Sequence, residues 1–469
     1  MAPVMARPPE PNRVMNTRLQ ILPNRGLGAE FRARVRAIAK LAVPVTAARA
    51  GMLVLIMVDT AMTGHASSTE LAFYGLGHAV HMVCMLIGVG MLVGTAVLCA
   101  QAMGAGALAE CGVIWRIAAV HALALGALFA LLALAGTQIY QLLGQEAALA
   151  AGAGGVLAIL NLGLPGQLVF TACILFLESL GRPGPGLVIM IGANLLNAGL
   201  NWLLIDGHFG LGAAGAAWAT TCVRWLIAVV AVIYIIAMAD ADRFNVAGPL
   251  RQGRVVGRKL RRLGYPLGLA QGLESAAFSA LILMAGYLGV HAVGAFQIVI
   301  NMVAFCYMGA IGVGTATAVH VGLAIGRQDQ RQMRLSGWAG LFAIAVLMAA
   351  LALLMAVFPG PLGRVFTQDT VLLAIVVPTL FVAAATLISD GAQGVLMGAL
   401  RGAGDVWIPS ALHLFSFVVI MVPAAAGFTF WAGLGTRGLM LGTFFGVTTA
   451  AVLLAVRFHV VAKRPIKRL

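Results

Sequence analysis

Charged residues are scarce in this 469-residue chain: Asp, Glu, Lys and Arg together make up 10% of it, and only 15 residues are acidic. A soluble domain carries about 25% charged residues, whereas 61% of this chain is hydrophobic and its mean hydropathy is +0.99. The apolar runs are longer than the roughly 10–14 residues of a helix buried in a soluble core. The alternating pattern of an outer-membrane barrel is absent. The composition therefore predicts an all-α polytopic membrane protein.

Several motifs that carry chemistry are also missing. The six cysteines form no C-x-x-C pair, which argues against a disulfide framework and against a zinc site. No G-x-x-x-x-G-K-[ST] stretch occurs, so the chain has no P-loop ATPase of its own. The TVGYG filter of a potassium channel, the Ser-His-Asp set and the H-E-x-x-H motif are absent as well. We therefore expect a protein that is not an enzyme and that holds no cofactor.

The net charge of +15 is concentrated in three segments. Residues 1–40 hold eight Arg and Lys residues, residues 240–263 hold seven, and the last seven residues hold four. This is the positive-inside pattern of a membrane protein, so we expect no nucleic-acid partner. It predicts a disordered cytoplasmic arm at 1–37, a cytoplasmic linker at 239–263 and a cytoplasmic tail at 458–469. No cleavable signal peptide is expected, because the first apolar run begins near Ile38 and continues as a full span.

Hydrophobic runs predict about twelve membrane-spanning helices. With the N-terminus in the cytoplasm, every second loop faces outward, and of 30 basic residues only Arg364 and Arg437 lie in or beside those outer loops. The asymmetry supports both the count and the orientation, and it places the C-terminus in the cytoplasm too. The predicted spans cover roughly 38–63, 72–99, 113–136, 148–178, 185–206, 212–238, 264–289, 292–321, 337–358, 370–400, 407–430 and 436–457.

The chain contains an internal repeat. A shift of 222 residues places Pro44 on Pro266 and Gly104 on Gly326, and a shift of 223 residues places Gly181 on Gly404. Each half has six spans, an even number, so both halves enter the membrane in the same direction. They are predicted to form a parallel repeat of two six-helix lobes, 38–238 and 264–457, which is one of the two layouts of secondary transporters.

Three carboxylates lie well inside predicted spans: Asp59 in 38–63, Glu274 in 264–289 and Asp390 in 370–400. An ionised carboxylate at the centre of a membrane helix costs about 2.5–3.5 kcal/mol on insertion scales. The repeat does not relate the three positions to one another. One interpretation is a structural ion pair with Arg49 or Arg224. The other is a binding set for a mobile cation or a proton, with Glu274 and Asp390 as candidate ligands of Na+, because the membrane carboxylates outnumber the bases.

Polar, aromatic and small residues accompany these carboxylates. The glycines that follow Asp390 at every fourth position leave room for a ligand or for close helix packing, and both interpretations stay open. His78 and His81 lie one turn apart in 72–99 and could relay protons, although packing roles are common for such residues. Apolar and aromatic side chains beside a carboxylate suit a lipophilic organic cation. The residues expected to line a substrate or cation cavity are Gln271, Phe278, Asn194, Asn197 and Asn201.

Several stretches resemble the multidrug and toxic compound extrusion (MATE) family. They are "PVTAARAGMLVLIMVDTAMTGHASSTELAFYGLG", "TAVLCAQAMGAG", "LESLGRPGPGLVIMIGANLLNAGLNWLLIDGHFGLGAAGAAWAT" and "MGALRGAGD", and the resemblance covers about 38–457. Asp59 in "VDT", Glu274 in "GLESAAF" and Asp390 in "LISDGAQG" match carboxylates of the NorM-like branch, and Asn197 and Asn201 match its Asn-x-x-x-Asn. Glu178 departs from the Arg that many relatives have.

The resemblance implies a V-shaped pair of lobes in a bacterial inner membrane. It also implies a monomeric secondary antiporter that exports lipophilic organic cations in exchange for protons or Na+ by alternating access. Other classes stay open. A flippase of lipid-linked precursors would need a basic cavity, for which only Arg49 and Arg224 are candidates. An exporter of an endogenous metabolite could share the architecture, a channel would pass flux without exchange, and a membrane enzyme would need a catalytic set that the sequence does not contain.

Overall fold

The computed structural model describes residues 27–142, 144–206, 209–249 and 253–466, and these residues form an all-helical protein. Within the described residues, twelve helices are long and apolar enough to cross a membrane, which confirms the predicted number. The first lobe contains α1 (Leu27–Ala66), α2 (Ser68–Leu92), α3 (Gly94–Gly104), α4 (Leu108–Ala133), α5 (Gly136–Leu142), α6 (Ala147–Leu162), α7 (Leu164–Ser179), α8 (Gly184–Asn201), η1 (Trp202–Asp206), α9 (Gly212–Ala237) and η2 (Asp242–Phe244).

The second lobe follows in the same order along the chain. It contains α10 (Gly253–Tyr287), α11 (Val290–Gly326), α12 (Gln330–Val357), α13 (Pro359–Phe366), α14 (Thr370–Gly402), α15 (Trp407–Leu414), η3 (Phe415–Met421), α16 (Val422–Ala426), η4 (Gly427–Trp431) and α17 (Thr436–Lys463). Three segments of this chain, η1, η3 and η4, are π-helical and lie inside the fifth and eleventh spans.

The ends of three predicted loop segments are helical. Residues 27–37 of the expected arm belong to α1, residues 253–263 of the expected linker belong to α10, and residues 458–463 of the expected tail belong to α17. The arm residues 1–26 lie outside the described part of the chain. The helices continue because these basic segments still carry apolar residues at helical spacing, such as the buried Leu260 and Phe458. Long Arg and Lys side chains can meanwhile reach the polar interface.

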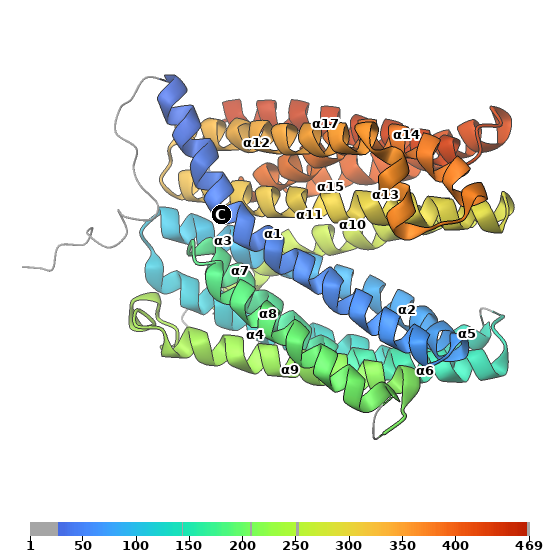
Figure 1. Cartoon of the computed structure of the whole chain (residues 1–469). Coiled ribbons are helices and arrows are strands. Elements are labelled where there is room, and N and C mark those ends of the chain that lie inside the picture. The colour runs from blue at the N-terminus through green and yellow to red at the C-terminus, as the bar shows by residue number, and fades with distance from the viewer. Residues whose placement is uncertain (1–26, 143, 207–208, 250–252, 467–469) are drawn as a thin grey trace, which may run out of the picture.

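The two lobes meet at one end of the molecule, where α1 begins, α10 begins and the chain ends (Figure 1). At that end a Cβ added to Gly104 would lie 2.2 Å from the Leu323 carbonyl oxygen, and one added to Gly326 would lie 2.1 Å from the Gln101 carbonyl oxygen. The repeat offset of 222 relates these two contacts. The lobe interface is therefore a pseudo-symmetric approach of backbones that only glycine permits.

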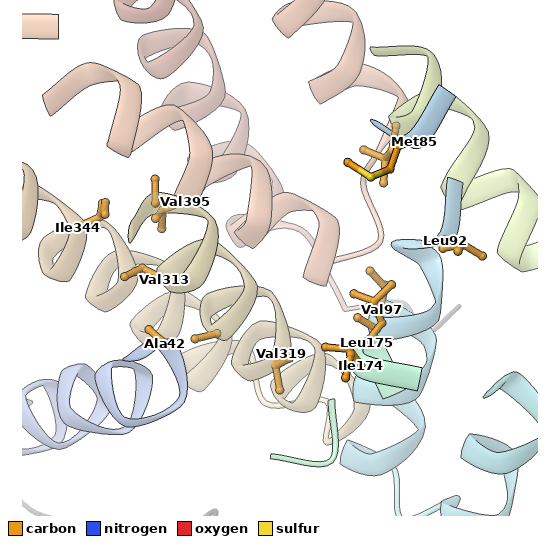
Figure 2. Packing of buried hydrophobic residues seen from close by; sticks show 14 of the residues in the cluster. Ala42, Met85, Leu92, Val97, Ile174, Leu175, Val313, Val319, Ile344 and Val395 are labelled. Carbon is orange, nitrogen blue, oxygen red and sulfur yellow. The ribbon is translucent and has the colours of Figure 1, made fainter. Parts of the chain in front are cut away.

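Apolar residues of both lobes form one buried cluster around this interface. Figure 2 shows Val97 and Ile174 of the first lobe and Val319 of the second lobe among the members of that cluster. Away from this end the lobes diverge, so that α5 and α13 lie far from one another at the opposite end of the molecule (Figure 1). The overall shape is that of a V closed at the end that carries the C-terminus.

Close packing explains part of the glycine series after Asp390. A Cβ on Gly398 would lie 2.4 Å from the Gly314 carbonyl oxygen of α11, and a Cβ on Gly402 would lie 2.4 Å from the Ala318 carbonyl oxygen. These two glycines serve the contact between α14 and α11 and leave no room for a ligand. Gly394, nearer to Asp390, lies beside the Tyr307 hydroxyl instead.

An ion pair at equivalent places in the two lobes ties the fourth span of each lobe to its sixth span. Arg182, which follows α7, donates to both oxygens of Asp240 at 2.8 and 2.6 Å. Asp405, which follows α14, accepts from Arg457 at 2.7 Å. A shift of 223 residues places Arg182 on Asp405, so the pair is kept while its polarity is reversed. The hydrogen bond from Arg182 lowers the pKa of Asp240 below its usual value.

Candidate functional site

Asp59 lies in the second half of α1 at the centre of a buried polar cluster. Its Oδ1 accepts a hydrogen bond from the Asn201 amide of α8 at 2.6 Å. Its Oδ2 accepts from the Tyr74 hydroxyl of α2 at 2.8 Å and from the Thr220 hydroxyl of α9 at 2.5 Å. All four side chains are buried. Three donors from three helices therefore stabilise a carboxylate that the membrane interior would otherwise disfavour.

Asn197 supports this cluster from one turn earlier in α8. Its amide donates to the Thr220 hydroxyl at 3.2 Å, and its carbonyl oxygen accepts from Asn201 at 3.3 Å. The structure thus brings Asn197 and Asn201 to Asp59, as their spacing suggested. Asn194 lies apart from this cluster: it is half-buried and its amide donates to the Met190 carbonyl oxygen of its own helix at 2.8 Å.

The two arginines considered as partners of the carboxylates have other contacts. Arg49 lies 3.4 Å from Glu178. Arg224 donates to His81 Nε2 at 2.7 Å and approaches the Leu160 carbonyl oxygen at 3.4 Å. Within the described residues no ion pair within 4.0 Å involves Asp59 or Asp390. The structural ion pair considered for Asp59 and Asp390 is therefore not formed.

The contact with Arg224 also decides the role of His81. A guanidinium can only donate hydrogen bonds, so His81 Nε2 must accept one and the ring must be neutral with its proton on Nδ1. His81 is fully buried. Its free lone pair is occupied, which removes it as a proton carrier in this state, whereas the His78 ring stacks on Tyr74 with centroids 5.5 Å apart.

Glu274 and Asp390 lie in the second lobe, on α10 and α14. Glu274 Oε2 is 3.6 Å from His413 Nε2 of α15, and Asp390 and Arg401 both act electrostatically on the Glu274 carboxylate. Asp390 Oδ1 accepts a hydrogen bond from Gln393 at 3.2 Å. The Glu274 side chain keeps 20% of its surface accessible. This set has fewer fixed donors than the Asp59 cluster, which leaves its oxygens free for a ligand.

Aromatic rings adjoin this second set. Phe278 packs edge to face against Phe417, with ring centroids 5.9 Å apart, and the His413 ring lies 4.3 Å from the Phe417 ring. Phe278 is one turn after Glu274, and the half-buried Gln271 is one turn before it. The structure therefore places Phe278 beside the acidic pair together with a ring from the eleventh span.

The three carboxylates do not form a single set. Asp59 and its donors belong to the first lobe, and Glu274 and Asp390 belong to the second. In the part of the chain that the structure describes, no group of three or more His, Cys, Asp or Glu residues could hold a metal ion. A Na+ ion at Glu274 and Asp390 would need neutral oxygens to complete its shell, such as those of Gln393 and Tyr307.

Sequence reasoning missed four residues of these sites: Tyr74, Thr220, His413 and Phe417. Thr220 was visible only as the repeat partner of Thr443, and the three rings look like ordinary apolar or interfacial residues of a span. Another signal is structural. The π-helical segment η1 directly follows Asn201, and η3 contains Phe417 and begins two residues after His413. Such widened turns occur frequently at functional sites, and here one adjoins each set.

Two pseudo-symmetric helical lobes with separate buried carboxylate sets define a membrane transporter of the two-lobe class. The sequence model of the MatE family matches residues 44–203 and 266–426, once in each lobe. The chain belongs to this family.

Similar proteins agree in sequence and in fold. The chain is 35% identical over 424 residues to the "Probable multidrug resistance protein NorM" of Caulobacter vibrioides, covering 90% of each chain. It is 29% identical over 459 residues to the "Multidrug resistance protein PmpM" of Pseudomonas aeruginosa, covering 94% of each chain. The crystal structure of the eukaryotic MATE transporter AtDTX14 superposes with a TM-score of 0.84 at 22% identity, over 92% of this chain and 98% of that one, which shows the shared fold.

Proposed function

We propose that this protein is a secondary active multidrug antiporter that exports lipophilic organic cations in exchange for protons or Na+. The names of its NorM and PmpM relatives support multidrug efflux. The observation that carries the exchange is that buried carboxylates lie in both lobes and that Asp59 and Asp390 form no ion pair with a Lys or Arg among the described residues. A transporter can neutralise such groups with a mobile cation.

The proposed orientation places the N-terminus and the C-terminus in the cytoplasm of a bacterium with this chain in its inner membrane. Support comes from the distribution of basic residues and from the bacterial origin of the curated relatives. In that orientation the lobes are closed on the cytoplasmic side and diverge toward the outside (Figure 1). Each chain contains both lobes and both carboxylate sets, so we expect a monomer to be the working unit.

The Asp59 cluster suits the binding of a proton. A protonated carboxyl must donate one hydrogen bond, and the amide of Asn201 cannot accept it because that amide nitrogen only donates. The hydroxyls of Tyr74 and Thr220 can accept, since each oxygen has lone pairs beside its proton. The cluster can therefore hold Asp59 in either charge state with the same side chains, and a change of charge there alters the hydrogen bonds between three helices.

The second-lobe set suits a larger cation. Glu274 is partly accessible, Asp390 lies near it, and the rings of Phe278 and Phe417 present apolar surface beside the acids. An organic cation gains from both the charge and the rings. A coupling ion and the substrate would compete for the same carboxylates, because two positive charges at one place repel each other. Mutual exclusion of this kind is what exchange requires.

The flippase alternative is less well supported. A pyrophosphate headgroup needs accessible basic side chains, but Arg49 lies beside Glu178 and Arg224 is buried against His81. A metabolite exporter would use the same acidic sets, and the choice of substrate separates it from a drug exporter.

Transport into proteoliposomes tests the proposal. A labelled lipophilic cation is followed under an imposed pH gradient, an imposed Na+ gradient and no gradient. We expect accumulation under one of the two gradients and its loss in Asp59→Asn, Glu274→Gln and Asp390→Asn. Asp242→Asn, an exposed acid outside the spans, is the matched control and should transport normally. Absence of movement under every gradient, or full coupled transport by all three variants, would overturn the proposal.

A further inference from the structure

The first turns of α1 lie against the opposite lobe. Figure 1 shows α1 beginning beside the second-lobe helix α12 and then crossing to the first lobe, where Asp59 lies. Arg34, Ile38 and Leu41 are buried along one face of this segment, whereas Arg32 and Arg36 on the other face are exposed. The buried face packs on α11 and α12: a Cβ on Gly312 of α11 would lie 2.9 Å from the Ala42 carbonyl oxygen.

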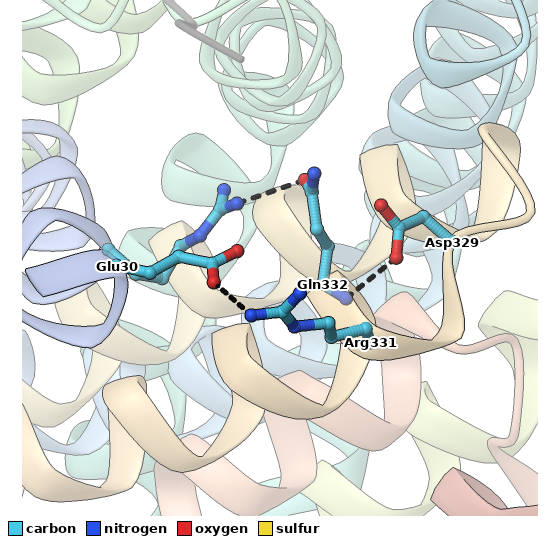
Figure 3. Close-up of polar contacts among 5 residues, drawn as sticks. Glu30, Asp329, Arg331 and Gln332 are labelled. Carbon is cyan, nitrogen blue, oxygen red and sulfur yellow. Dashed lines mark hydrogen bonds and ion pairs between the residues drawn. The ribbon is translucent and has the colours of Figure 1, made fainter. Parts of the chain in front are cut away.

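Two polar contacts join this segment to the start of α12 (Figure 3). Arg331 donates to Glu30 Oε2 at 2.6 Å, and Arg34 donates to Gln332 Oε1 at 2.9 Å. Asp329 caps α12 by accepting from the Gln332 backbone N–H at 2.9 Å, which holds the second acceptor in place.

An aromatic contact accompanies the polar ones. The rings of Phe31 in α1 and Phe342 in α12 meet edge to face with centroids 5.7 Å apart. Three different kinds of contact therefore connect residues 30–34 with one helix of the other lobe. All of them lie at the end of the molecule where the lobes meet.

Glu30 is an exception in its segment. Residues 27–40 contain Arg32, Arg34, Arg36 and Lys40, and Glu30 is the acid among them. A positive-inside signal does not need this acid, but a contact with Arg331 does. Arg331 keeps 54% of its side chain exposed, so the pair is a surface ion pair, and such pairs are weak. A weak contact suits an interface that must form and separate in every transport cycle.

We propose that residues 27–40 of α1 are a latch that holds the two lobes together at the end bearing the C-terminus, with Glu30–Arg331 as its polar lock. The lock breaks whenever the lobes open at that end. The inference rests on the alternating access proposed above. It adds a specific prediction: the same helix carries the latch in its first turns and the Asp59 cluster in its second half.

Inter-lobe distances test the latch without any transport measurement. Spin labels at two exposed positions of the same end, Asp242→Cys in the first lobe and Lys463→Cys in the second, report the separation in a background without the native cysteines. We expect Glu30→Gln to move the population toward longer distances. Arg32→Gln, which removes one charge from the exposed face of the same helix, should leave the distribution unchanged.

A charge exchange adds a second criterion. Glu30→Arg and Arg331→Glu should each lengthen the distances, and the double variant should restore the original distribution. Identical distributions in all variants, or a double variant no closer to the original than the single ones, would overturn the latch. The proposal would fall in the same way if Glu30→Gln and Arg32→Gln had equal effects.

Cross-linking guards against effects of misfolding. Glu30→Cys with Arg331→Cys, bridged by a short thiol-specific reagent, should abolish transport, and cleavage of the bridge by reductant should restore it. Unchanged transport in the bridged protein refutes the latch while the proposed antiport stands. Shifted distances in a protein that moves no cation would refute the antiport and leave the latch intact.

Discussion

Replacing Gly104 by Ala should open the lobes at the end where they meet. The added Cβ would lie 2.2 Å from the Leu323 carbonyl oxygen and 2.9 Å from its Cα, both backbone atoms of the other lobe. A backbone cannot yield as the tip of a flexible side chain can. Overpacking of this kind costs about 1–3 kcal/mol. Because the clash exists only when the lobes touch, separation of the lobes relieves it.

The expected effect is a shift of the closed-to-open ratio. A free energy of about 1–3 kcal/mol corresponds to a factor of about 5–150 in that equilibrium. The inter-lobe spin-label distance is the assay, and the long-distance population should rise in Gly104→Ala. Gly326→Ala, the repeat-related change that meets the Gln101 carbonyl oxygen at 2.1 Å, should act in the same direction.

Gly199→Ala provides the matched control, since Gly199 lies inside α8 and a Cβ there would meet nothing within 4 Å. It should change neither the distances nor the transport rate. The reasoning is refuted if Gly104→Ala keeps the closed distance distribution while the thermal unfolding temperature stays that of the parent. It is also refuted if Gly199→Ala opens the lobes to the same extent.

Three further changes have defined outcomes. Asp59→Asn should reduce gradient-driven uptake at least about tenfold while the protein stays folded by size-exclusion chromatography, because the amide cannot bind a proton or a metal cation as the carboxylate does. Phe278→Ala should raise the KM for an aromatic or quaternary cation by about 2–30-fold, the equivalent of about 0.5–2 kcal/mol, whereas Phe278→Tyr should retain affinity; equal KM values for both variants would exclude a ring contact. Arg182→Gln should lower stability by about 1 kcal/mol at neutral pH. Since Arg182 holds the pKa of Asp240 below its ordinary value of 3.8, the contribution of the pair is complete above that value and disappears as the pH falls through the lower, folded-state pKa, so the unfolding temperatures of parent and variant should converge in acid.

Much of the architecture could be read from the chain because the responsible forces act locally. Long apolar runs predict membrane spans wherever they occur, and the structure has the expected twelve in its described residues. The repeat placed Gly104 on Gly326, and these two glycines prove to be equivalent points of the lobe interface. The ends of helices were less predictable. Basic residues hid the helical character of residues 27–37, since a charged side chain at a membrane surface is compatible with either a loop or a helix.

The carboxylate sites were predictable only in part. Asp59, Glu274 and Asp390 stand out because a charge inside a span is costly wherever its helix lies. Their partners follow from which helices touch. Tyr74, Thr220 and His413 come from elements distant in sequence, and nothing in their local pattern distinguishes them from packing residues.

The sequence alone thus determined the class of the protein, the number of spans, the duplication and the positions of the buried acids, since hydropathy, charge cost and spacing are properties of single segments. Only the tertiary structure decided that the acids form two sets, that Arg224 is engaged by His81, that two glycines beyond Asp390 serve packing, and that Glu30 reaches Arg331. Each of those facts is a contact between helices. A contact depends on how side chains from distant segments fit together in three dimensions, and one helix on its own does not contain that information.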